Sequence, residues 1–123
     1  MTHTLSYSYS TGGSAAVTAV SATAEEETNL DLTVPASSTN MLTAYVLDVS
    51  QCKGFFMVAD ADMTVKTNSS GSPAQTFTLT AGTPIAWIYG SGTCPVTSDV
   101  TALYITSAAG GLLTIRSLID PTV

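Results

Sequence analysis

Hydrophobic and polar residues alternate with a period of two along most of the chain, which is the pattern of half-buried β-strands. The segment LSYSYS (5–10) alternates strictly, and NLDLTV (29–34) places Leu30, Leu32 and Val34 on one face. The pattern predicts strands at 5–10, 15–22, 29–34, 44–49, 55–59, 63–67, 75–79, 85–89, 102–106 and 112–118.

Clusters of Gly, Pro, Ser and Asn separate these segments, at spacings of about 8 to 12 residues that are typical of sandwiches and barrels. SAAGG (107–111) predicts a hairpin that joins the last two strands, and Pro121 predicts an extended tail. IAWIY (85–89) is dense in large apolar residues, which predicts a strand buried on both faces. The one candidate for a helical turn lies around residues 25–27, where three consecutive glutamates suit a helix N-terminus, but this stretch is too short to predict a helix.

These features predict an all-β fold: an antiparallel β-sandwich, jelly-roll-like, or a barrel of about 8–10 short strands. The 123 residues are enough for one domain and its hydrophobic core. We therefore expect a single β-sandwich domain over 1–123, with an N-terminal arm at 1–12 and a C-terminal tail at 119–123.

Charge is sparse and negative. Charged residues make up 10% of the sequence, and nine acidic residues against three basic ones give a net charge of −6. Because such a chain repels phosphate groups, nucleic acid and anionic membranes are poor partners. The segment MTHTLSYSYS has no basic stretch followed by an apolar run, so we expect a mature protein made in the cytoplasm.

The two cysteines, Cys52 and Cys94, are too few for a disulfide framework. One bridge between them is possible. A reducing compartment favours two free thiols over that bridge.

The residues that catalysis most often needs are scarce. His3 is the single histidine, so a Ser-His-Asp or Cys-His arrangement would require the N-terminus to pack into a site. Asp60 and Asp62 could form a carboxylate pair, but Asp is depleted in strands and satisfies backbone donors in turns. We therefore interpret both as turn residues, and we expect no enzyme activity, no cofactor and no metal.

Three further features have a structural interpretation and a functional one. Asn68-Ser69-Ser70 matches a glycosylation acceptor, which requires export and otherwise arises by chance in a Ser/Thr-rich chain. The Glu25–Glu27 run is either a solvated face or a contact for a basic partner. The aromatic residues could form a carbohydrate-binding strip, although Trp87 lies in the most apolar strand and is expected to be buried. They are Tyr7, Tyr9, Tyr45, Trp87, Tyr89 and Tyr104.

The second half of the chain resembles a known family. The blocks DMTVKTNSS, LTAGTPIAW, DVTALYITSAAGG followed by LTIRSL, and the closing DPT lie within residues 60–123. They are similar to small β-rich proteins that tailed bacteriophages encode beside the major capsid protein. The resemblance implies a virion structural protein, specifically a capsid decoration or cement protein that binds the assembled shell and stabilises it.

The resemblance also implies partners and a location. The partners would be the major capsid protein and further copies of the chain, as a dimer or trimer on a capsid symmetry axis. The location would be the outer capsid surface of the virion. The expected contact segments are the N-terminal arm, the loop near residue 70 and the tail, represented by Leu5, Tyr7, Tyr9, Ser70, Ser72, Asp120, Pro121 and Val123.

Two alternatives remain open from the sequence. The protein could occupy a tail, neck or fibre position in the virion instead of the capsid shell. It could also be a carbohydrate-binding module, if several of the tyrosines lie exposed on one face of a sheet.

Overall fold

Ten strands and one short 3₁₀ turn make up the regular structure of a computed structural model, which describes residues 3–7, 20–24, 26–90 and 92–121. Residues 3–7 and 20–24 are described by their backbone. The elements are β1 His3–Tyr7, β2 Val20–Ala24, β3 Glu26–Val34, β4 Ser38–Thr43, η1 Val49–Gln51, β5 Cys52–Ala59, β6 Met63–Thr67, β7 Thr76–Leu79, β8 Ile85–Ile88, β9 Leu103–Ser107 and β10 Gly111–Ile119.

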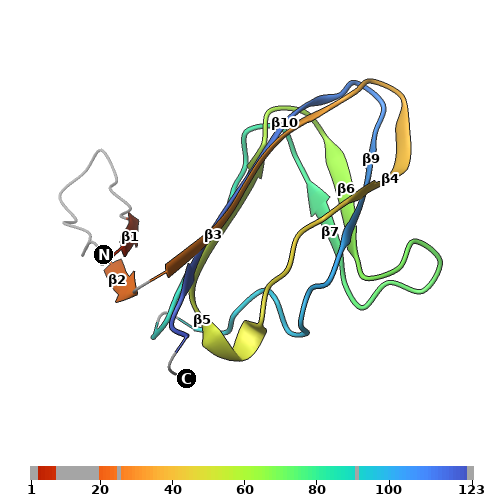
Figure 1. Cartoon of the computed structure of the whole chain (residues 1–123). Coiled ribbons are helices and arrows are strands. Elements are labelled where there is room, and N and C mark those ends of the chain that lie inside the picture. Colours follow the sequence, from red (N-terminus) through yellow and green to blue (C-terminus); the bar gives the residue numbers. More distant parts are fainter. Residues whose placement is uncertain (1–2, 8–19, 25, 91, 122–123) are drawn as a thin grey trace, which may run out of the picture.

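The strands form two four-stranded antiparallel sheets, in the orders β3-β10-β5-β8 and β4-β9-β6-β7. A separate two-stranded sheet pairs β1 with β2. Figure 1 shows the two larger sheets facing each other, with the β1–β2 hairpin beside the first of them. Except for β6 and β7, consecutive strands from β3 to β10 alternate between the sheets. This order is that of an eight-stranded jelly roll, so the predicted all-β sandwich is confirmed and the barrel alternative is not.

The core lies between the two sheets and is built from alternate residues of each strand. Val65 and Ile105 from one sheet meet Leu113 and Ile115 from the other, and each is at most 1% exposed. Trp87 is also part of this core, as expected, and its indole nitrogen donates to the Gly92 carbonyl at 2.9 Å. The period of two in the sequence therefore reports the inner faces of both sheets.

One polar pair lies inside the core. Tyr45, which is 5% exposed, and Ser117, which is 1% exposed, share a hydrogen bond through their side-chain oxygens. Burial raises the pKa of Tyr45 to about 12, because the phenolate would lose its hydration in the core. The bond satisfies two hydroxyl groups that would otherwise be costly to bury.

The predicted strand at 44–49 is wrong. The strand lies earlier, at β4, and residues 44–48 belong to no strand and make one isolated bridge, from Leu47 to Val100. Tyr45 and Leu47 are nevertheless buried and their neighbours exposed, so the alternation there reports burial and not sheet pairing. The Asp48 carboxylate accepts from the Ser50 amide at 3.0 Å and begins the 3₁₀ turn instead.

The hairpin prediction is also wrong. SAAGG is not a hairpin within one sheet, because β9 and β10 belong to different sheets and the segment crosses between them. No helical turn forms at the described glutamates, since Glu26 and Glu27 are exposed residues at the start of β3. A local sequence pattern does not distinguish a hairpin from a crossing between sheets, because both need the same turn residues.

Strand β8 and the end of strand β10 also differ from the prediction. β8 is an edge strand and not one buried on both faces: Trp87 and Ile88 are buried, whereas Ala86 and Tyr89 are exposed. The expected tail begins one residue later than predicted, because Ile119 is the last residue of β10 and is 6% exposed.

Candidate functional site

The outer face of the β4-β9-β6-β7 sheet is a broad, nearly uncharged surface. The strand register aligns its outward residues in two rows across the sheet. We call this surface the threonine face and define it by Thr78, Thr64 and Thr106 in one row, and Thr76, Lys66, Tyr104 and Leu42 in the other.

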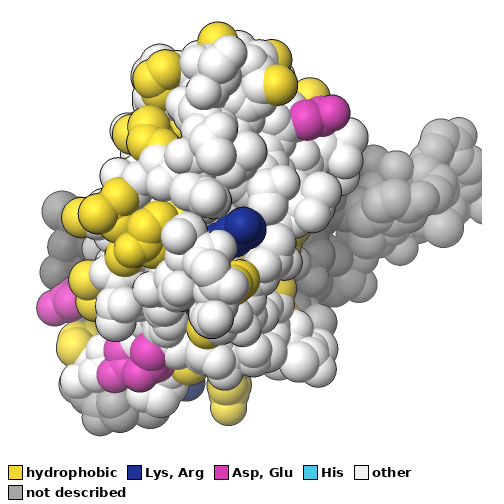
Figure 2. Space-filling model, turned by 90° about the vertical axis from the view of Figure 1, so that its right-hand side faces the viewer, with side chains coloured by type: hydrophobic (Ala, Val, Ile, Leu, Met, Phe, Trp, Pro, Cys, Tyr) yellow, Lys and Arg dark blue, Asp and Glu magenta, His cyan; other side chains and the backbone are white. Residues whose placement is uncertain are grey.

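Lys66 is the one charged residue among these seven. Its ammonium group donates to the Ser70 carbonyl at 3.2 Å, so its charge is tied to the loop that follows β6. Leu42, on the edge strand β4, is 63% exposed. Figure 2, which views the molecule from this side, shows one cationic side chain near the middle, acidic groups only near the margins, and hydrophobic side chains gathered on one flank. Surfaces of low charge with exposed apolar groups are typical of the centres of protein interfaces.

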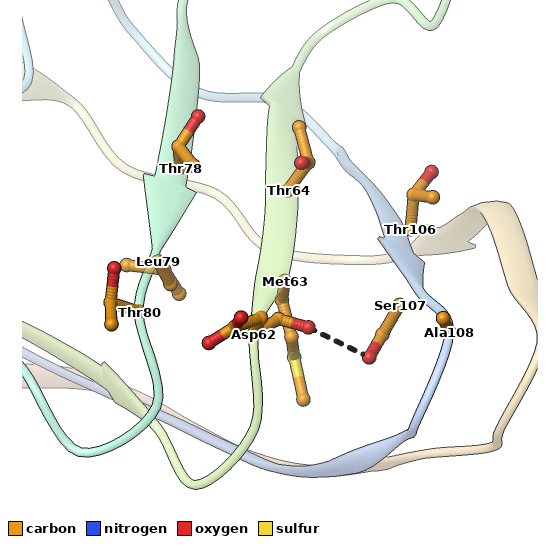
Figure 3. A pocket seen from close by; sticks show the side chains of 9 residues that line it. All are labelled: Asp62, Met63, Thr64, Thr78, Leu79, Thr80, Thr106, Ser107 and Ala108. Atoms are coloured by element: carbon orange, nitrogen blue, oxygen red, sulfur yellow. Dashed lines mark hydrogen bonds between the residues drawn. The ribbon is translucent and has the colours of Figure 1, made fainter.

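A shallow depression with a volume of about 280 Å³ lies at one end of the face. Figure 3 shows Thr78, Thr64 and Thr106 side by side from β7, β6 and β9. The residues around the depression are Asp62, Met63, Thr64, Thr78, Leu79, Thr80, Thr106, Ser107 and Ala108. Such a lining offers hydroxyl groups to neutral polar partners.

Polar groups at the rim of the depression are bonded within the protein. The Ser107 hydroxyl donates to the Asp62 carbonyl at 2.9 Å, and the Asn40 amide donates to the Thr106 hydroxyl at 2.9 Å. These bonds hold β4, β6 and β9 together at this end of the sheet. Hydrogen bonds within the protein therefore fix the shape of the depression, which is open and shallow.

The aspartates act as turn residues, as expected. Asp60 accepts from the Leu112 amide at 2.7 Å, and Asp62 accepts from the Ala81 amide at 2.8 Å. Each carboxylate thus satisfies a backbone donor, one in β10 and one in the connection between β7 and β8. Within the described residues, no group of three or more His, Cys, Asp or Glu side chains is placed to hold a metal ion.

Asn68 is a structural bridge, a role that no local pattern in the sequence indicated. Its side-chain nitrogen donates to the Asp99 carbonyl at 2.9 Å, and its side-chain oxygen accepts from the Thr101 amide at 2.8 Å and from the Thr101 hydroxyl at 3.1 Å. The Asn68 backbone amide also donates to the Ala102 carbonyl at 2.9 Å. The residue of the acceptor motif that would carry a glycan therefore anchors the chain leading into β9.

The described aromatic side chains do not form one strip. Tyr45 and Trp87 lie in the core. Tyr89 is 64% exposed next to β8, whereas Tyr104 lies on β9 in the other sheet. Lys53 places its ammonium group 4.1 Å from the centre of the Tyr89 ring, in a cation–π contact. This arrangement does not favour a carbohydrate-binding module.

The structure places the loop predicted as a contact segment next to the threonine face. Ser70 and Ser72 lie between β6 and β7, and the Ser72 backbone amide donates to the Ser69 hydroxyl at 3.1 Å. This loop projects beyond the sheets at the lower right of Figure 1. Ser72 is exposed and Ser70 is half-buried.

The other predicted contact residues lie elsewhere. Asp120 follows β10 and its backbone amide donates to the Gln51 carbonyl at 2.8 Å, while Pro121 is exposed. Leu5 and Tyr7 lie on β1 and pair with β2 of the same chain. Tyr9 and Val123 lie outside the described residues.

The β1–β2 hairpin lies against the outer side of the other sheet. β2 contacts β5, β8 and β10, and β1 contacts β10. Beneath it, Leu118, Gly54 and Ile88 are in register across three strands and are buried, although Leu118 and Ile88 are not part of the core cluster. The hairpin therefore covers an apolar row at one end of this sheet, and the threonine face is on the opposite side of the molecule.

The register that creates the threonine face could not be read from the sequence. The strands MTVKT, QTFTL and ALYIT each place less apolar residues at alternate positions, such as Thr76 and Thr78 in QTFTL, which indicates an outer face for each strand alone. Which strands lie side by side depends on contacts between distant segments. Within the described part of the chain, no helix is both long and apolar enough to cross a membrane.

No protein-family model matches the chain, and no curated protein matches it. One similar solved structure comes from the work "Bacillus endospore appendages form a novel family of disulfide-linked pili". The two chains are 14% identical with a TM-score of 0.38, over 77% of this chain and 87% of the other. A likeness of this size supports no inference about the present chain.

Proposed function

We propose that the chain is a structural protein of a tailed-phage virion, a decoration or cement protein that binds the outer surface of the assembled capsid and stabilises it. The family resemblance of residues 60–123 motivates the proposal. The partners are the major capsid protein and further copies of the chain, as a dimer or trimer on a capsid symmetry axis. The location is the outer surface of the virion.

The observation that carries the proposal is the threonine face. A surface with one charge among seven outward residues can lie against another protein without removing many charges from water. Threonine hydroxyls can also exchange hydrogen bonds with backbone groups of a partner. These properties suit a protein that must lie on a large protein shell.

The frame behind this face supports the same use. Jelly-roll sheets joined by a continuous core form a rigid plate, since close-packed interiors deform little. A rigid plate that binds only the expanded capsid stabilises that state by mass action, and many copies add their weak contacts. The loop with Ser70 and Ser72 lies at the border of the face, where it can reach a second capsid subunit.

The experiment measures binding to capsids of the phage that encodes the chain. Purified protein is mixed with empty expanded capsids or with procapsids, and bound protein is measured after pelleting. We expect saturable binding to expanded capsids, in many copies per particle, and a higher temperature of capsid disruption. Absence of binding to expanded capsids would contradict the proposal.

Two exposed threonines provide a matched pair of variants. Thr78 lies on the threonine face in the edge strand β7, and Thr33 lies on the outer side of the other sheet in the edge strand β3. We expect Thr78→Glu to weaken capsid binding at least about tenfold, because a buried unpaired charge is costly at an interface. Thr33→Glu should bind as the unmodified chain does. Equal effects of the two variants would refute the choice of face.

Cryo-electron microscopy of virions separates the capsid position from the alternatives. Density for the chain at repeated positions on the shell supports the decoration protein. Density confined to one vertex, the neck or the fibres would replace the proposal with a tail-associated role.

A further inference from the structure

The two cysteines lie 42 residues apart in the sequence, but both reach the same core in the fold, so that one covalent bond could join them. Cys52 begins β5, is 4% exposed and belongs to the core. Cys94 lies in the connection between β8 and β9, is partly buried and packs against the same core. Both thiols are free in this structure, and, besides burial, each one affects the pKa of the other.

The loop that carries Cys94 is held on both sides of the cysteine. Before it, the Trp87 indole donates to the Gly92 carbonyl at 2.9 Å. After it, the Gln75 side-chain amide donates to the Pro95 carbonyl at 2.9 Å and accepts from the Thr97 amide at 2.8 Å. Cys94 is thus held against the core that contains Cys52 before any bond forms. Anchoring of this kind raises the effective concentration of one thiol at the other.

Cys52 is held in the same way. Its thiol donates to the Gly54 carbonyl at 3.3 Å, and the Tyr89 amide donates to the Lys53 carbonyl at 3.0 Å. The second bond fastens the start of β5 to the residue after β8, from which the loop departs. The two segments that a bridge would join are therefore already attached to each other.

We propose that Cys52 and Cys94 form a reversible intramolecular disulfide when the folded protein meets a low-molecular-weight disulfide, such as oxidised glutathione. The bond would lock the β8–β9 loop onto the start of β5. The proposal does not rest on the proposed function.

The reaction is a pair of thiol–disulfide exchanges. The partly exposed Cys94 loses its proton to solvent and its thiolate attacks one sulfur of the reagent, which releases one small thiol and leaves a mixed disulfide. The Cys52 thiolate then attacks the Cys94 sulfur and releases the second small thiol. The protein loses two electrons and two protons in total, and the reagent is reduced to two thiols.

The environment makes this reaction slow and dependent on pH. Burial raises the pKa of Cys52 to about 12 and also raises the pKa of Cys94. Since only the thiolate attacks, the rate at a fixed concentration of reagent should rise about tenfold per pH unit near neutrality. The pair would therefore stay reduced through brief exposure and oxidise on prolonged exposure.

The test uses the full chain, reduced, folded and purified, in buffers of stated ratios of oxidised to reduced glutathione. Samples are quenched with a maleimide and analysed by intact mass and by peptide mapping without reduction. We expect a monomer lighter by two hydrogen atoms, with a peptide that links Cys52 to Cys94. Retention of both free thiols in oxidised glutathione alone at pH 8.5 would overturn the proposal, as would a product made only of intermolecular dimers or glutathione adducts.

A second measurement does not depend on any variant. The glutathione ratio that half-oxidises the pair is compared between the folded chain and the chain unfolded in urea. Contact in the folded state should make the folded pair easier to oxidise, by at least about tenfold in this ratio. An equal or harder oxidation in the folded state would refute the inferred geometry.

Cysteine variants supply the control. The oxidised chain should unfold at a higher urea concentration than the reduced chain, whereas Cys94→Ser and Cys94→Ala should show no difference between the two buffers. A similar shift in these variants would assign the effect to something other than the bridge and would count against the proposal.

Discussion

Asn68 offers the sharpest test of how the segment that leads into β9 is held in place. The residue has a φ of 71°, in the left-handed region, and makes three side-chain hydrogen bonds to Asp99 and Thr101. Replacement by alanine removes all three bonds. Alanine also tolerates the left-handed conformation less well than asparagine, because it has no side-chain group that can form local hydrogen bonds.

The expected cost follows from these contacts. Each hydrogen bond contributes about 0.5–1.5 kcal/mol net, and values near the lower limit apply because Asp99 and Thr101 are exposed and water can replace the lost partner. Three bonds then contribute about 2 kcal/mol, and the left-handed backbone adds about 1 kcal/mol for alanine. We expect Asn68→Ala to lower the free energy of unfolding by about 3 kcal/mol, or the melting temperature by roughly 10 °C for a chain of this length.

Urea denaturation followed by tryptophan fluorescence measures the change, since Trp87 lies in the core. Asn68→Gly separates the two contributions, because glycine adopts the same backbone conformation without strain and should cost about 1 kcal/mol less than alanine. Asn29→Ala is the control: Asn29 is exposed on β3 and makes a 3.4 Å contact to Glu27, so we expect a change below about 0.5 kcal/mol. A loss below about 1 kcal/mol for Asn68→Ala would contradict this prediction.

Three further predictions concern the core, one turn and one ion pair. Tyr45→Phe should lower the free energy of unfolding by about 1–2 kcal/mol, because the Ser117 hydroxyl stays buried without its partner, and adding Ser117→Ala should recover most of the loss in a double-mutant cycle. Gly110→Ala should destabilise the fold by more than about 2 kcal/mol, because Gly110 has a φ of 75° and a Cβ there would lie 2.5 Å from the backbone nitrogen of Ala36. Gly71→Ala is the control, since no atom lies within 4 Å of the added Cβ, and its stability should change by less than about 0.5 kcal/mol. Calorimetric melting of both variants measures the difference. Arg116→Ala breaks an ion pair whose side chains are 36% and 57% exposed, so the change in urea midpoint should be small and should disappear in 1 M salt; a loss above about 1 kcal/mol would contradict this.

Much of the fold could be predicted from the sequence because a strand's faces are a local property. Residues 63–67 form the predicted strand with the same bounds, and residues 75–79, 85–89, 102–106 and 112–118 match to within a residue at each end. Even at 44–49, where no strand forms, the alternation correctly indicates that Tyr45 and Leu47 are buried. Burial follows from hydrophobicity alone, whereas a strand also needs a partner to receive its hydrogen bonds.

Much less of the candidate site could be predicted. The threonine face exists because β6 lies between β7 and β9, and this order is set by how the two sheets close over the core. Only the loop with Ser70 and Ser72 was identified from the sequence and then found beside that face.

The amino-acid sequence, through its period of two and its turn residues, is sufficient for an all-β sandwich and for the side of each strand that faces inward. Only the tertiary structure places β9 and β10 in different sheets, ties Asn68 to Thr101 across 33 residues and brings Cys52 and Cys94 to the same core. The physical reason is that a strand's inward face depends on neighbouring residues along the chain. The neighbouring strands with which that strand pairs depend on the packing of the whole core, because that packing must offset the entropy lost when long loops close.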